Sequence, residues 1–341
     1  TKKVSHFDRA GRPVQETALS ASPSGNDIIR FYRYDCMNRG DSVTYLPYTL
    51  EETGGSLREN PEAEQKAFYR EYYTANEYNF AYSSKEYDTS PLGVPVKSGG
   101  PGREYSIDGG SAGHYTAYIY GRNTALEVYK YTVALDGSFS CSTRYAAGTL
   151  LKTQSAYYAT DGVRTLQTEY RDSEGRLVAK STVTGNENPR FTCYAYDELG
   201  RLRYVIPPIV HEQIKGLQMS ITPASASYKK YWYYYEYDRY GRTVVASKPG
   251  KADAYFVYGK QNAWFYYIYD TQDRVLDKCI VREKTPGSLT RASIQERYYA
   301  DGFDNTYPYL GGTDTPLVPF SGSLFVLQAH LESARYDDYD I

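Results

Sequence analysis

A short phrase recurs along this chain and constrains its fold more than any other feature. An aromatic residue is followed by Asp, two variable residues, Gly, Arg and an apolar residue. Strict and looser copies lie at residues 7–14, 34–39, 172–177, 196–202, 237–243 and 269–275. Because the phrase is used so often, it indicates a repeated structural unit and says more about how the chain is built than about chemistry.

Each copy predicts a β-hairpin. Aromatic residues before the Asp favour a strand, and Asp suits the first position of a type I turn. Gly three residues later supplies the positive φ that a type I turn with a bulge requires. Asn38 and Asp273 take the Gly position in two looser copies, and both residue types tolerate the left-handed region.

The candidate site residues are therefore the structural residues of these turns. They are Asp8, Gly11, Arg12, Asp35, Arg39, Asp172, Gly175, Arg176, Tyr196, Asp197, Gly200, Arg201, Tyr237, Asp238, Gly241, Arg242, Tyr269, Asp270 and Arg274.

Tyrosines alternate along the predicted strands, as at Tyr233, Tyr235 and Tyr237. Period-two spacing places such residues on one face of a sheet. Cross-strand aromatic packing is the favoured interpretation, because the tyrosines follow the repeat. A platform on which glycans stack is the alternative.

Composition narrows the class of protein. The chain holds 41 Tyr in 341 residues and has a formal net charge of −2. Acidic and basic side chains are closely mixed, which argues against a nucleic-acid surface. A mean hydropathy of −0.64 together with abundant aromatic residues favours a large all-β sheet that is wet on both faces.

No residue pattern in the sequence indicates catalysis. Four cysteines, at 36, 141, 193 and 279, lie far apart and do not cluster with the histidines, so we expect no metal site and no disulfide framework. Cys193 is expected to be a buried free thiol. The sequence lacks the common nucleophile, zinc and phosphate-loop motifs, so neither an enzyme nor a cofactor is expected.

No apolar run is long enough for a membrane span, and no signal peptide is present. The chain begins at Thr1 without Met, and we interpret it as cut from something longer. Unpaired sheet edges attract other chains, so we expect this segment to need its continuation or a neighbour.

Three regions are predicted. Residues 1–110 form an N-terminal region, 111–283 a repeat sheet, and 284–341 a continuation of that sheet. Asn60 as N-cap and Pro61 in the first turn predict a short helix at about 61–72. Residues 88–110 are predicted to be an ordered long loop or a boundary, and a second short helix is expected within 209–219. A hairpin turn is missing from the pattern at 260–264.

Longer landmarks accompany the short phrase. FDRAGRPVQ (7–15), TYLPY (44–48), GGPG (99–102) and LRYVIPP (202–208) follow one another in order. In these segments the chain resembles the Rhs/YD-repeat family, in the form found in large secreted or surface proteins of Bacteroidetes. The resemblance covers nearly the whole chain.

This resemblance implies a wide curved sheet of hairpins, with one or two short helices, that forms part of a spiralling hollow shell. In full-length members the shell encloses a C-terminal toxin or effector. The implied partners are the rest of the same polypeptide and its enclosed cargo, in a secreted or cell-surface protein. A module that binds surface glycans or proteins through its Tyr-rich faces is the alternative.

Overall fold

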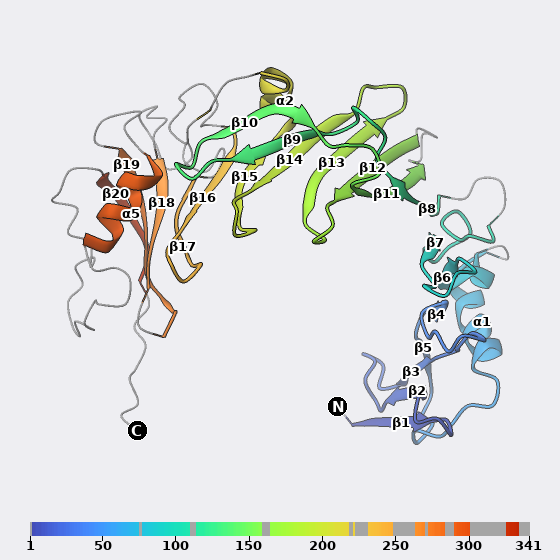
Figure 1. Ribbon diagram of the computed structural model, residues 1–341. Helices are drawn as coiled ribbons and strands as arrows, with labels where there is room; N and C mark the ends of the chain where they lie inside the picture. Colours follow the sequence, from blue (N-terminus) through green and yellow to red (C-terminus); the bar gives the residue numbers. More distant parts are fainter. Residues whose placement is uncertain are drawn as a thin grey trace. The chain divides into compact units, whose positions relative to one another are not determined.

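The computed structural model describes residues 2–74, 77–109, 114–158, 164–217, 221, 231–247, 263–269, 272–283, 290–300 and 325–333 (Figure 1). Strands dominate these residues, and every strand pair whose register is described is antiparallel. The predicted all-β class with a large antiparallel sheet is therefore confirmed.

The largest sheet has 14 strands in the order β20-β19-β18-β17-β16-β15-β14-β13-β12-β11-β8-β7-β6-β4, and β1-β2-β3-β5 and β10-β9 form smaller sheets. Sequence neighbours are mostly sheet neighbours, as expected for a series of hairpins. The strands are β1 (Lys3–Phe7), β2 (Pro13–Ala18), β3 (Asp27–Phe31), β4 (Val43–Tyr45), β5 (Tyr48–Leu50), β6 (Tyr82–Tyr87), β7 (Pro95–Gly99), β8 (Thr116–Arg122), β9 (Tyr129–Val133), β10 (Phe139–Arg144), β11 (Leu151–Tyr158), β12 (Arg164–Arg171), β13 (Leu177–Thr184), β14 (Arg190–Tyr196), β15 (Leu202–Ile206), β16 (Tyr233–Tyr237), β17 (Thr243–Ser247), β18 (Ala263–Tyr269), β19 (Val275–Glu283) and β20 (Phe325–Ser333).

The chain divides into two compact units. Unit 1 comprises Thr1–Tyr120, Thr153–Thr168 and Thr182–Asn188, and unit 2 comprises Gly121–Lys152, Glu169–Ser181 and Pro189–Ile341. The predicted division at residues 110/111 and 283/284 stays a prediction.

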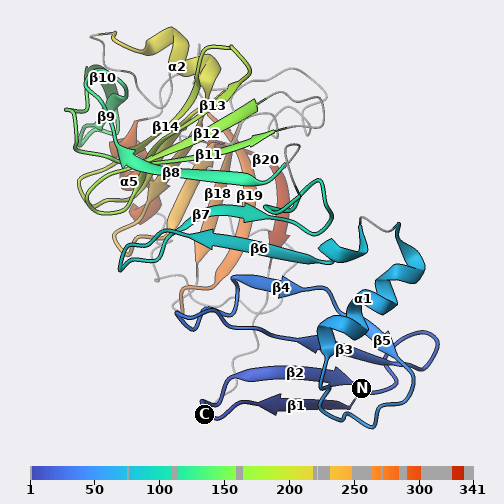
Figure 2. The ribbon, with the colours of Figure 1, turned by 90° about the vertical axis from the view of Figure 1, so that its right-hand side faces the viewer.

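Unit 1 builds its core between the small sheet and helix α1 (Pro61–Tyr72), which lies beside β3 and β5 (Figure 2). The buried residues Ile29, Phe31 and Tyr48 form this core, and Phe68 and Tyr69 of the helix pack against them. A 3-10 turn, η1 (Tyr78–Phe80), follows the helix. The helix thus covers one face of the small sheet with aromatic side chains.

Unit 2 buries one face of its strands far more completely than the composition suggested. The β9–β10 hairpin, helix α2 (Pro208–Ile214) and helix α5 (Arg291–Ala300) contribute buried residues to the same apolar cluster as β14 to β19 (Figure 1). Trp232 and Tyr234 lie in this cluster with no exposed surface. The expectation of a sheet wet on both faces is wrong here, because a hairpin and two helices cover one of them.

The alternating tyrosines lie on the opposite face of β16, as period-two spacing predicted. Tyr233, Tyr235 and Tyr237 are half-buried. Tyr235 and Tyr267 pack against a small buried cluster of Ala246, Phe265 and Ile280. These residues are neighbours across β16 to β19, so cross-strand packing accounts for this tyrosine series.

Several local predictions need correction. The side chain of Asn60 makes no capping hydrogen bond, although the helix begins at Pro61 as expected. The segment 88–110 is not one long loop, because β7 lies inside it. A third helix, α5, was not predicted in the region expected to continue the sheet. The residue before this helix is nevertheless of a type that favours a helix start, because Thr290 Oγ1 accepts from the Ser293 N–H at 3.1 Å as an N-cap does.

Some predictions fall outside the described residues. These include positions 260–262 of the missing-turn segment, the ranges 284–289 and 301–324, and the last residues from 334. Among the helices that the structure describes, none combines the length and apolar character that a membrane crossing requires.

Candidate functional site: the repeat turns and their joints

The repeated phrase forms the predicted turn wherever a complete copy is described. In the first copy the Gly11 N–H donates to Asp8 O at 3.0 Å, and the Asp8 N–H donates to Arg12 O at 2.9 Å. Gly11 has a φ of 75°. The same pair of hydrogen bonds closes the turns at 35–39, 172–176, 197–201 and 238–242, so the phrase specifies one backbone geometry.

The Asp carboxylate holds each turn closed. In the copy at 197–201, Oδ1 accepts from the N–H of Leu199 at 3.0 Å and of Arg201 at 2.9 Å. Oδ2 accepts from Nε of Arg201 at 2.9 Å. The corresponding Oδ2–Nε bonds are 2.7 Å for Asp8, 2.6 Å for Asp35, 2.8 Å for Asp172 and 2.7 Å for Asp238. One carboxylate therefore satisfies two backbone donors and fixes the Arg side chain.

The carboxylates of the first two copies are stabilised in their charged form. The backbone N–H of Arg12, and then its guanidinium, lower the pKa of Asp8. The backbone N–H of Arg39 is likewise the largest cause that lowers the pKa of Asp35. Charge-assisted hydrogen bonds of this kind are stronger than neutral ones.

The Arg of each turn also contacts the aromatic residue of a later hairpin. The Arg12 guanidinium lies 4.4 Å from the centre of the Tyr34 ring, and Arg39 lies 3.9 Å from that of Tyr87. In unit 2 the pairs are Arg176 with Tyr196 at 5.2 Å, Arg201 with Tyr237 at 5.3 Å and Arg242 with Tyr269 at 4.8 Å. These distances are within the range of cation–π attraction.

The hydroxyl of that same tyrosine completes the contact. In four of these five pairs it donates to the backbone carbonyl of the residue that follows the Arg, whereas Tyr87 bonds the side chain of Asp41. The bonds are Tyr34 to Pro13 at 2.9 Å, Tyr196 to Leu177 at 2.8 Å, Tyr237 to Leu202 at 2.7 Å and Tyr269 to Thr243 at 2.8 Å. We call this combination of an Arg–ring contact and a Tyr–carbonyl bond the joint between two hairpins.

Two of the looser copies add an acceptor to the joint. Arg12 Nη1 donates to Asn38 Oδ1 at 2.7 Å, and Arg242 Nη1 donates to Asp273 Oδ1 at 2.8 Å. Both acceptor residues have positive φ, 63° and 64°. Sequence reasoning treated them only as replacements for Gly, whereas the structure shows that their side chains bind the Arg of the preceding copy.

Segment 87–95 is a hairpin of the same kind that the sequence analysis missed. The Asp88 N–H donates to Val94 O at 2.9 Å, and Asp88 Oδ1 accepts from the Val94 N–H at 2.9 Å. Tyr120 donates to Pro95 O at 2.8 Å, as the tyrosines of the joints do. The Tyr87-Asp88 pair was the available signal, but two extra residues in the turn hid it.

The last copy is described only in part. Asp270 lies outside the described residues, so its role as a turn residue stays a prediction. Tyr269 forms its joint with the preceding hairpin, and Arg274 is half-buried.

A buried charge cluster was not predicted at all. Glu236 has no exposed surface, and it forms an ion pair with the equally buried Arg203. Its carboxylate also accepts from Tyr234 Oη at 2.6 Å, Gln295 Nε2 at 2.6 Å and Arg291 Nε at 3.3 Å. The cluster joins β15, β16 and α5. The sequence did contain one indication of this cluster, because Glu236 alternates with Trp232 and Tyr234 and is therefore expected on the same face of the strand.

A thiol and an imidazole also meet in the core of unit 2. Cys193 Sγ lies 3.4 Å from His211 Nδ1, and the Tyr131 hydroxyl lies 2.7 Å from the same nitrogen. Burial raises the pKa of Cys193 and lowers that of His211 to about 4. Both groups are therefore neutral near pH 7, and their exposures of 0% and 2% leave no route for a substrate. This arrangement differs from a catalytic dyad, in which the thiol is ionised and accessible.

All four cysteines are free. Within the described ranges, no group of three or more His, Cys, Asp or Glu side chains is placed to hold a metal ion.

Comparison with known proteins relates this chain to a family model and to solved structures. Residues 1–119 match the family model described as "Domain of unknown function (DUF6443)". The solved structure titled "Crystal Structure of TcdB2-TccC3" is similar to 83% of this chain, with a TM-score of 0.33 and 11% sequence identity. This chain spans 12% of the length of that one. None of the curated proteins matches.

Proposed function

We propose that this chain is a segment of an Rhs/YD-repeat β-shell whose function is containment. The resemblance in sequence implies that the full-length protein encloses a C-terminal toxin or effector segment. Its partners would then be the remainder of the same polypeptide and that cargo, in a secreted or cell-surface protein. No enzymatic role is proposed for these residues.

The observation that carries the proposal is the joint between hairpins. Each joint connects one copy of the phrase to another by the same two contacts, as at Arg176 with Tyr196, Arg201 with Tyr237 and Arg242 with Tyr269. A module that bonds to its neighbour in this way extends a sheet by repetition. Stability in such arrays is roughly a sum of unit and interface contributions, which suits a wall better than a single reactive cleft.

The inaccessible thiol and imidazole support the same proposal. Cys193 and His211 are the described pair whose residue types come nearest to a nucleophile with its base. Their burial and neutral state favour a packing role, which leaves the repeat architecture as the main property of the chain.

The test uses the complete polypeptide encoded by the reading frame that contains these residues. Limited proteolysis should leave its C-terminal segment intact longer than the same segment expressed alone. A triple variant, Tyr196→Phe, Tyr237→Phe and Tyr269→Phe, should shorten that protection, while Tyr240→Phe should not. Digestion of the C-terminal segment at equal rates inside and outside the polypeptide would refute containment.

A second candidate function is binding of a surface glycan or protein. It is favoured by the half-buried Tyr233, Tyr235 and Tyr267, which present aromatic surface on one face of unit 2. A glycan array probed with this chain should then give a specific signal that Tyr235→Ala abolishes and Tyr240→Ala retains. An array without signal above background would count against this alternative.

A further inference from the structure

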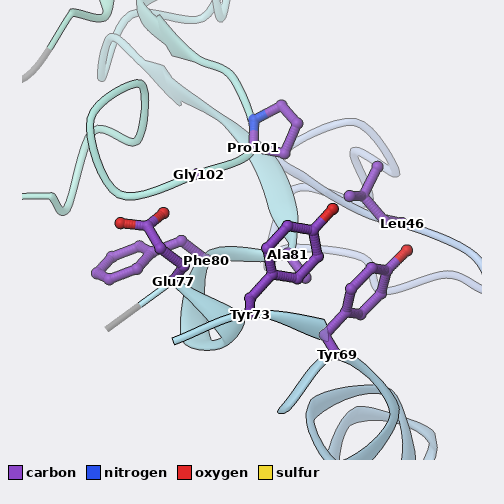
Figure 3. A pocket seen from close by; sticks show the side chains of 8 residues that line it. All are labelled: Leu46, Tyr69, Tyr73, Glu77, Phe80, Ala81, Pro101 and Gly102. Carbon is purple, nitrogen blue, oxygen red and sulfur yellow. The ribbon is translucent and has the colours of Figure 1, made fainter. Parts of the chain in front are cut away.

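A small cavity in unit 1 lies outside the repeat joints. It has a volume of about 200 Å³ and is lined by aromatic side chains from the end of α1 and from η1. Figure 3 shows the rings of Tyr69 and Tyr73 beside each other, with Phe80 and Glu77 across from them and Pro101 above. Tyr69 also packs against the core of unit 1, but none of the residues that line the cavity belongs to a repeat joint.

The walls of the cavity are held in place by bonds within the protein. Tyr69 donates to Pro47 O at 2.7 Å, and its ring is stacked with that of Tyr73 at 5.8 Å and 28°. The Phe80 N–H donates to Glu77 O at 2.9 Å, and the Gly102 N–H donates to Phe80 O at 2.8 Å. A ligand would therefore meet a formed site and would not have to order it, which lowers the cost of binding.

The charge of the lining selects the class of ligand. Glu77 is the single charged side chain among the residues that line the cavity. Its Oε2 accepts the Arg103 N–H at 3.1 Å, and no basic side chain contributes to the lining. Aromatic ring faces are electronegative, so rings and carboxylate together attract a cation. A sugar would require several directional polar side chains, and this lining supplies few.

We propose that this cavity binds an alkylammonium group, such as the end of a lysine side chain or a methylated amine. Cages of aromatic rings with quaternary or methylated ammonium ligands use the same physical attraction. The proposal is independent of containment, because it concerns a site in unit 1 that takes no part in the joints.

The test is a titration of this chain, followed by NMR, with tetramethylammonium, with an Nα-acetyl-lysine amide, and with neutral 2,2-dimethylpropan-1-ol as the uncharged analogue. The cations should bind saturably and the alcohol should not. Tighter binding of the lysine derivative would assign the site to a protein partner, and tighter binding of tetramethylammonium to a small amine.

Two variants test the lining separately. Glu77→Gln removes the charge, and Tyr73→Leu removes a ring that is 55% exposed, so loss of folding is not expected. Each should weaken cation binding by about fivefold or more, while Glu71→Gln on the exposed surface of α1 should not. Equal binding of the alcohol and the cations, or unchanged affinity in both variants, would overturn the proposal.

Discussion

The hydroxyl of Tyr237 donates to the carbonyl oxygen of Leu202 at 2.7 Å, while its ring lies 5.3 Å from the guanidinium of Arg201. Two contacts of different kinds therefore connect one tyrosine to two consecutive residues of the preceding hairpin. Burial raises the pKa of this tyrosine to about 12, so the hydroxyl stays a donor through the neutral range. The recurrent phrase thus encodes both a turn and the means of attaching that turn to its neighbour.

Tyr237→Phe removes the hydroxyl and keeps the ring. The Leu202 carbonyl then loses its side-chain partner, and we expect the free energy of unfolding to fall by about 1 kcal/mol. Urea unfolding of the two proteins measures the difference. The matched control is Tyr240→Phe, whose ring is 53% exposed. Equal effects of the two substitutions would show that the hydroxyl bond does not stabilise the joint.

Gly241→Ala tests the turn without disturbing any neighbour. Gly241 has a φ of +85°, and a Cβ placed there meets nothing within 4 Å. The cost is therefore backbone strain alone, about 1 kcal/mol of the free energy of unfolding. Gly241→Asn should cost less, since Asn tolerates this region. Gly121→Ala is the control, because that site is equally open and lacks a positive φ. Thermal unfolding of the variants measures the loss of stability. An equal loss in Gly241→Ala and Gly121→Ala would argue against backbone strain as the cause.

The hairpins could be predicted because their determinants are local. Asp and Gly at fixed spacing close the turn, and even Asn38 and Asp273 were recognised as residues that suit positive φ. The joints could not be predicted in the same way, because Arg12 and Tyr34 or Arg201 and Tyr237 meet only after the strands between them pair. The phrase contained both partners but gave no sign that each Arg contacts the tyrosine of another copy.

The sequence did not predict that a hairpin and two helices bury one face of the unit 2 strands, and the reason is different. Trp232 precedes β16, whose buried face carries Tyr234 and Glu236, and glutamate is ordinarily found exposed to water. Glu236 is instead buried because Arg203 of β15 and Arg291 and Gln295 of α5 converge on its carboxylate from two other elements. Such convergence of distant side chains leaves no periodic signal, and it explains why α5 was not expected against the sheet.

Glu236→Gln should be among the most destabilising single changes in unit 2. It removes the nearer ionic partner of the fully buried Arg203, whose other acidic neighbour, Asp197, lies 3.9 Å away, and breaking one half of a buried pair costs about 3–5 kcal/mol. We expect a large fall in the urea midpoint, with partial recovery in the double variant Arg203→Met with Glu236→Gln. Glu174→Gln, at an exposed turn position, should change little. A midpoint for Glu236→Gln within error of the wild type would mean that the cluster does not hold the sheet and α5 together.

Acid should weaken unit 2 through His211. Burial lowers its pKa from 6.5 to about 4 in the folded protein, so the unfolded chain binds this proton more readily than the folded one. The contribution of the neutral histidine to the free energy of unfolding is fully present above pH 6.5 and declines as the pH falls from 6.5 to about 4. The total loss over this range is about 3 kcal/mol. Urea unfolding at a series of pH values measures this slope.

His211→Asn provides the comparison for that measurement. Asn retains an oxygen that can accept from the Tyr131 hydroxyl, which lies 2.7 Å from Nδ1 in the wild type, and it cannot be protonated in this range. The variant should lose some stability near pH 7 because packing in the core changes. Between pH 6.5 and 4, however, its free energy of unfolding should fall less steeply than that of the wild type. Parallel pH profiles for the two proteins would place the acid sensitivity in other groups, since only the histidine differs between them.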